Sequence, residues 1–276
     1  MTSRISRLLA SIALSGAALL GMAANASAQD CTPASQFKTI EAGTLKVVAP
    51  DFPPFFTYKG DELGGFEGEF FKRFAKDNCL TIEVTLLPAG SVIEAIRNGQ
   101  GDVGGGGWTP NEKRGEIVGQ TRSLLTNPSV FIGFDPKAEL EAYAGKTIGT
   151  VIGYDFVNDL QAWGEANGAT IKLYDSPDAG FADVRAKRLD ILVLGGINGQ
   201  YRVSQFPAPG LASIAAEKVD AVPRFGQEGA TNIVHTKDNP ELTAALNAEI
   251  EVIRADGTLK EMLAKNELSD DLIPQE

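Results

Sequence analysis

Residues 102–114 read DVGGGGWTPNEKR, and they predict a strand that runs directly into a place where a ligand can be held. The apolar strand beginning at Asp102 leads into four consecutive glycines, which leave the backbone open to close approach. Thr109 then supplies a hydroxyl, and Arg114 supplies a planar guanidinium that matches a carboxylate. The stretch therefore favours a site that binds a small acid over a site that catalyses a reaction.

The residues around this stretch alternate between strand and helix patterns. Residues 82–86 alternate apolar and polar side chains, as a strand does, and residues 91–98 have the apolar spacing of a helix before Asp102 begins the next strand. The same order recurs from Ile171 to Asp190. Two strand–helix–strand units predict two α/β lobes with mainly parallel sheets. The remaining predicted elements are strands 45–49, 147–151 and 232–234, helices 66–77 and 241–264, and a helix opened by Gly153.

We expect the chain to leave one lobe, build the other and return. Residues 29–133 plus 232–276 are expected to form lobe 1, and residues 134–231 lobe 2. The crossings are expected near Phe131–Phe134 and Thr231–His235. Two connections of this kind permit hinge closure.

Residues 1–28 have the features of a cleaved secretory signal. Arg4 and Arg7 are followed by an uncharged, mostly apolar run and then by an A-x-A site, Ala26-Ser27-Ala28. The apolar run is shorter than the roughly 20 residues of a membrane span. We therefore expect export to the periplasm without membrane insertion.

The overall charge and the cysteines limit the possible partners. A formal net charge of −11 argues against nucleic acid as a partner. Cys31 and Cys79 would form a disulfide in an oxidising compartment, or else remain two free thiols. His235 is the single histidine and no C-x-x-C occurs, so we expect no metal site and no cofactor.

Familiar catalytic and nucleotide motifs are missing or misplaced. Residues 99–104 match G-x-G-x-x-G, but they follow a predicted helix and enter a strand, the reverse of the dinucleotide arrangement. No P-loop and no G-x-S-x-G elbow occur. Several candidate residues also have ordinary structural explanations: Arg114 as a solvated charge, Trp108 as a core residue and Asp155 as a helix cap.

The chain resembles the periplasmic solute-binding proteins of the polar amino-acid type, bacterial extracellular family 3, which serve ABC importers. The resemblance extends from about Gly43 to Leu268. The residues that carry it are Gly43–Val47, Pro53–Phe55, Gly65–Glu67, Ile96–Asp102, Thr109–Arg114, Gly145–Gly149, Asp190, Lys237–Leu242 and Ala255–Leu259.

The resemblance implies a type II periplasmic binding protein fold, with two α/β lobes, two hinge strands and a ligand cleft between the lobes. It implies that Thr109 and Arg114 bind the carboxylate of the ligand and that Phe52 stacks on it, with Trp108 as a second apolar wall. The backbone at Gly106 and Gly107 would line the cleft. Lobe 2 would contribute a helix N-terminus at Gly153, Tyr154 and Asp155. Gly195, which follows a strand of the same lobe, would also line the ligand.

Two residues depart from the family pattern. Gly195 stands where the family usually has an acid that pairs with the α-ammonium of the ligand, and Asp155 replaces a hydroxyl residue. A buried ammonium needs a partner, so either Asp155 or Glu67 supplies it or the ligand lacks that group.

We expect an exported, non-catalytic and monomeric protein that captures a small carboxylate-bearing solute and delivers it to a membrane ABC permease. One alternative is a periplasmic cyclohexadienyl dehydratase-like enzyme on the same fold, with Asp155 or Glu67 as the acid. A second alternative is the sensor module of a receptor.

Overall fold

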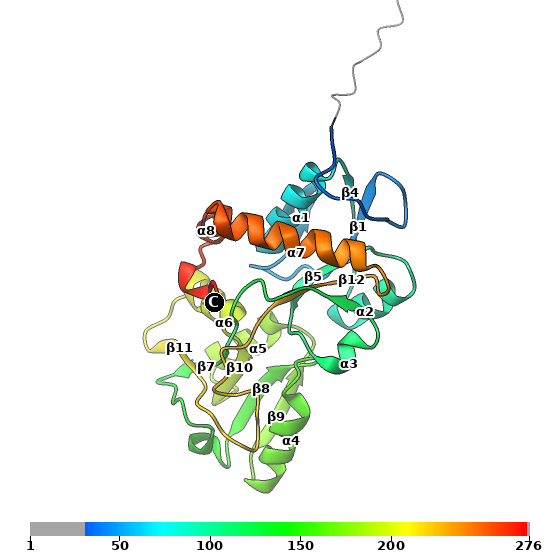
Figure 1. Cartoon of the computed structure of the whole chain (residues 1–276). Coiled ribbons are helices and arrows are strands. Elements are labelled where there is room, and N and C mark those ends of the chain that lie inside the picture. The colour runs from blue at the N-terminus through cyan, green and yellow to red at the C-terminus, as the bar shows by residue number, and fades with distance from the viewer. Residues whose placement is uncertain (1–30, 275–276) are drawn as a thin grey trace, which may run out of the picture. The chain divides into compact units, whose positions relative to one another are not determined.

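The computed structural model describes residues 31–274 (Figure 1). The predicted signal peptide, residues 1–28, lies outside the described residues. Within residues 31–274 no helix is long and apolar enough to span a membrane. Cys31 and Cys79, the two cysteines of the chain, are both disulfide-bonded, which confirms the predicted bridge over two free thiols.

The first lobe is built on a five-stranded sheet with the order β4-β1-β5-β12-β6. Strand β1 is parallel to β4 and β5, whereas β12 is antiparallel to both β5 and β6. The strands are β1 Thr44–Ala49, β4 Thr81–Leu86, β5 Val103–Trp108, β6 Gly119–Gln120 and β12 Asn232–His235. The helices of this lobe are α1 Phe66–Asp77, α2 Ala89–Arg97, α3 Glu112–Gly115, α7 Pro240–Ala255 and α8 Thr258–Lys265, and α7 crosses the sheet near β5 and β12 (Figure 1).

The second lobe repeats this plan with the order β11-β7-β10-β8-β9. Strand β8 is parallel to β9 and β10, and β7 is antiparallel to its neighbours β10 and β11. The strands are β7 Ser129–Phe134, β8 Thr147–Val151, β9 Thr170–Tyr174, β10 Ile191–Gly195 and β11 Leu211–Ala215. The helices are α4 Val157–Ala166, α5 Pro177–Arg185 and α6 Gly196–Gln205. The predicted two-lobe α/β architecture is confirmed. A short hairpin, β2 Thr57–Lys59 and β3 Glu62–Gly64, and 3₁₀ turns at Leu140–Tyr143 and Asp270–Leu272 complete the elements.

The first crossing between the sheets lies upstream of its predicted place. Because β7 pairs on both sides within the second sheet, the chain leaves the first sheet between Gln120 and Ser129 rather than near Phe131–Phe134. The two connecting segments meet where Thr231 pairs with Leu125: the Thr231 N–H donates to the Leu125 carbonyl at 2.8 Å.

Helix α1 forms because its phenylalanines recur on one face, as the sequence predicts. Phe66, Phe70, Phe71 and Phe74 are all fully buried, and the Phe70 ring packs 5.8 Å from Phe71 and 6.3 Å from Phe74, centroid to centroid. Gly65, at φ 78°, lets the chain turn into the helix where a Cβ would lie 2.6 Å from the Phe55 carbonyl oxygen. The helix therefore has a fixed start and a fixed buried face.

Replacing Phe70 by alanine should lower the free energy of unfolding by about 3–5 kcal/mol, because it leaves a cavity in this cluster. Urea unfolding measures the loss. The control Val252→Ala changes a residue of α7 that is 46% exposed and should cost far less. Equal losses in the two variants would contradict the description of α1 as a core helix.

Candidate ligand-binding site

The glycine-rich end of β5 is held by a buried carboxylate. Glu67, in the first turn of α1, is fully buried, and its oxygens accept the N–H groups of Gly106 at 2.5 Å and Gly107 at 3.0 Å. Gly107 adopts φ 68°, and a Cβ there would lie 2.8 Å from the Phe55 ring. The two amides that were expected to line the cleft are therefore taken up by Glu67, and what these glycines offer a ligand is the absence of side chains.

The pKa, hydrogen bonds and burial of Glu67 indicate a structural role for its carboxylate. Burial raises the pKa of Glu67 to about 7, against the opposing effect of the two glycine N–H groups. Both of its oxygens are engaged and the residue is fully buried. This placement does not favour Glu67 as the partner of a ligand amine or as a catalytic acid.

Arg114 and Thr109 lie together after β5. Asn111 caps the short helix α3 by accepting the N–H of Arg114 at 2.7 Å, which fixes where the arginine side chain starts. The half-buried guanidinium donates to the Thr109 carbonyl and lies 5.1 Å from the centre of the Trp108 ring. Within residues 31–274 no carboxylate oxygen lies within 4 Å of the Arg114 guanidinium, and the Thr109 hydroxyl makes no hydrogen bond. Both groups therefore keep polar capacity for a ligand.

Asp155 reaches this group of residues from the second lobe. Its charge counteracts the lowering of the Arg114 pKa that burial causes. The expected helix start at Gly153 is wrong: α4 begins at Val157, and Gly153, at φ 96°, belongs to a turn before it. Asp155 is thus not a helix cap, and its Oδ2 lies 3.5 Å from Nε of Arg224.

Gly195 ends β10 at a place with no room for a side chain. A Cβ at Gly195 would lie 2.8 Å from Nδ2 of Asn127, a buried residue whose Oδ1 accepts the N–H of Ile197 at 3.1 Å. The Gly195 N–H itself donates to the Tyr154 hydroxyl at 3.3 Å. Asn127 therefore occupies the space that an acidic side chain at position 195 would need.

The two aromatic residues expected to contact the ligand, Phe52 and Trp108, are only partly exposed. Phe52 is half-buried and stacks on the buried Phe55, with ring centres 5.9 Å apart. Trp108 is also half-buried, and its Nε1 donates to the Gly105 carbonyl at 2.9 Å. Each ring keeps one part in the packing of lobe 1 and one part accessible.

Helix α6 joins the second lobe to the first loop of lobe 1. Nδ2 of Asn198 donates to the Pro53 carbonyl at 3.0 Å, and Nη1 of the buried Arg202 lies 3.5 Å from the same oxygen. Asn198 and Arg202, like Asn127 and Arg224, were not among the residues predicted from the sequence. Their contacts come from segments far apart in the chain, and no local pattern marks them.

Two surface hollows lie outside the candidate site within residues 31–274. Within residues 31–274 no group of three or more His, Cys, Asp and Glu residues is placed to hold a metal ion. Two surface hollows, of about 350 and 630 Å³, lie on lobe 1, and none of the candidate ligand residues lines them.

The chain matches one protein family over most of its length. The family model described as "Bacterial extracellular solute-binding proteins, family 3" matches residues 45–267. The arginine-binding extracellular protein ArtP of Bacillus subtilis (strain 168) is 25% identical over 239 residues, covering 82% of this chain and 87% of that protein. The putative amino-acid ABC transporter-binding protein PatH of Vibrio harveyi is 24% identical over 237 residues, covering 82% of this chain and 90% of that protein. Among solved structures, an ancestral arginine-binding protein bound to arginine matches with a TM-score of 0.69 at 24% identity, covering 81% of this chain and 97% of that chain.

The raised pKa of Glu67 predicts a specific pH dependence of stability. Because the folded protein holds the proton more tightly than the unfolded chain, stability should fall as pH rises from 4.5 to about 7 and then level off. The fall should be about 3 kcal/mol, since one pKa unit corresponds to about 1.4 kcal/mol. Urea unfolding of wild type and Glu67→Gln across this range should show a fall that is about 3 kcal/mol larger in wild type, because the buried Asp102, Glu249 and His235 contribute equally to both proteins. The exposed control Glu62→Gln should match wild type, and an identical slope in Glu67→Gln and wild type would contradict the assignment.

Proposed function

Because the chain belongs to the bacterial extracellular solute-binding proteins of family 3, we propose that it captures a small carboxylate-bearing solute between its two lobes and delivers it to a membrane ABC permease. The solute would be an amino acid or a related derivative. The protein would act in the periplasm after removal of residues 1–28, as a monomer and without catalysis. The relatives named as binding proteins support this reading over a dehydratase.

The observation that carries the proposal is the half-buried guanidinium of Arg114, which lacks a carboxylate within 4 Å among residues 31–274. A cation withdrawn from water without a counterion is unfavourable, so an anionic ligand group gains from binding there. The unused hydroxyl of Thr109 would add a hydrogen bond. Trp108 would form an apolar wall, and Phe52 would stack on the ligand from the first loop of lobe 1.

The second lobe would close on the ligand with the turn that carries Gly153, Tyr154 and Asp155. Position 195 is a glycine whose side-chain space is taken by Asn127, so no acid at this position can bind an amine of the ligand. A carboxylate is thus the required group of the ligand, and an α-amino group is not.

Replacing Arg114 by alanine should raise the dissociation constant of the ligand at least about 30-fold, since losing one partner of a desolvated charge pair costs roughly 2 kcal/mol or more. Isothermal titration calorimetry measures the change. The control Arg97→Ala removes an arginine of α2 that is paired with Glu94 on the surface and should leave binding unchanged. Unchanged affinity in a folded Arg114→Ala protein would contradict the proposed role.

A thermal-shift panel identifies the ligand class. Amino acids, amino-acid derivatives and small organic acids are each added to the wild-type protein. A ligand at about 100 times its dissociation constant should stabilise the folded state by about 2.7 kcal/mol. The compounds that shift the melt should all carry a carboxylate, and a shift confined to compounds without one would overturn the proposal.

A further inference from the structure

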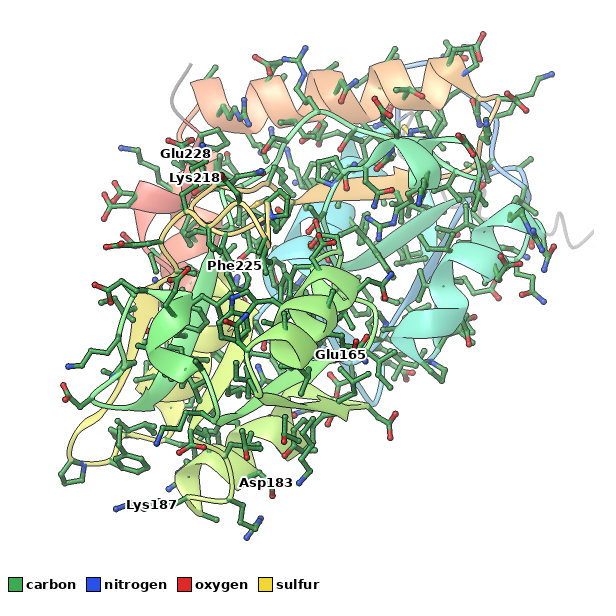
Figure 2. The ribbon with its side chains drawn as sticks, turned by 90° about the horizontal axis from the view of Figure 1, so that it is seen from below. Glu165, Asp183, Lys187, Lys218, Phe225 and Glu228 are labelled. Atoms are coloured by element: carbon green, nitrogen blue, oxygen red, sulfur yellow. The ribbon has the colours of Figure 1, made fainter. Side chains whose placement is uncertain are left out.

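A second arginine, Arg224, lies beside Asp155 in the second lobe. It sits on the segment 216–231 that leads from β11 back to β12, and Figure 2 labels three other residues of this segment, Lys218, Phe225 and Glu228. Phe225 is fully buried and packs edge-on against Phe131, with ring centres 5.4 Å apart. This packing anchors the backbone that carries Arg224, so the position of the arginine is set by the core of lobe 2.

The guanidinium of Arg224 is only partly satisfied. Its side chain is 11% exposed, and Nη2 donates to the Asn127 carbonyl at 2.7 Å. Nη1 is buried and has no hydrogen-bond partner among residues 31–274. Nε lies 3.5 Å from Asp155 Oδ2, longer than the roughly 2.7–2.9 Å of a good charge-assisted hydrogen bond. A buried donor without an acceptor is costly, and a ligand oxygen would relieve that cost.

Asp155 Oδ2 lies 3.5 Å from Nε of Arg224, and the charge of Asp155 also reaches Arg114 from beyond 4 Å. Asp155 acts electrostatically on Arg114 from lobe 1 and on Arg224 from lobe 2. The three groups together carry one unmatched positive charge, while Arg114 has only a neutral carbonyl as its hydrogen-bond acceptor. Asp155 is the loosest member, because its side chain is 26% exposed and can turn to solvent.

We propose that the ligand is a small dicarboxylate, with one acid group bound by Arg114 and Thr109 and the second bound by Arg224, where it displaces Asp155. This inference rests on the proposed function, since it specifies the ligand of the same site. Arg224 is the residue that selects for the second acid group. Asp155 occupies the second anion position until the ligand arrives.

The test compares pairs of acids of matched length. Calorimetric titration is carried out with succinate against butyrate and with glutarate against valerate. Wild type should bind each diacid about tenfold or more tightly than its monoacid, the gain expected for one charged hydrogen-bonded contact. Arg224→Gln, which keeps a donor for the Asn127 carbonyl, should bring this ratio close to one.

Two further variants complete the test. Lys218→Gln removes the same charge from an exposed position of the same segment and should keep the wild-type ratio. Asp155→Asn, at a partly exposed position where misfolding is not expected, should strengthen diacid binding because it removes the competing carboxylate. Its effect decides the matter if Arg224→Gln fails to fold.

The outcomes separate the two proposals. If wild type binds a monocarboxylate or an amino acid through Arg114 with no preference for a diacid, or if Arg224→Gln keeps the preference, the inference about the dicarboxylate is overturned and the proposed function stands. Weaker diacid binding in Asp155→Asn also overturns the inference. If no carboxylate binds to wild type at all, the proposed function fails, and the inference fails with it.

Discussion

The arrangement of the site depends on the buried carboxylate of Glu67. By accepting the N–H groups of Gly106 and Gly107, it holds a stretch of backbone that has no side chains of its own to pack. That stretch leads directly to Thr109 and Arg114, so the position of these two proposed ligand-binding residues follows from the contact between Glu67 and the strand. The free-energy cost of burying Glu67 is thus the cost of a rigid support for a charged side chain.

The charges around Asp155 connect the two lobes. Arg114 comes from the first sheet, Arg224 from the segment that returns from the second, and Asp155 from the turn before α4. None of these groups has a full set of partners within its own lobe. Because such incomplete pairing is unfavourable in a buried setting, a bound anion and lobe closure would stabilise each other.

The sequence predicts the local elements well and the contacts between them poorly. The face of α1 and the two strand–helix–strand units follow from apolar periodicity, which depends on neighbouring residues. The start of α4 was misplaced because Gly153 looks like a helix-opening residue, although its backbone forms a turn. The place of β7 in the second sheet and the contact of Arg224 with Asp155 depend on residues distant in the chain, which one sequence does not reveal.

The contact between Gly195 and Asn127 has a consequence for how this protein could change over evolution. A side chain at position 195 would place its Cβ 2.8 Å from Nδ2 of Asn127, so the gain of an acid there requires the Asn127 side chain to move or to be replaced. Asn127 also accepts the N–H of Ile197 and, through its carbonyl, a donor of Arg224. The two positions are therefore coupled: an acid at position 195 is accommodated only together with a displacement or replacement of Asn127, which would also disturb the contacts that Asn127 makes with Ile197 and Arg224.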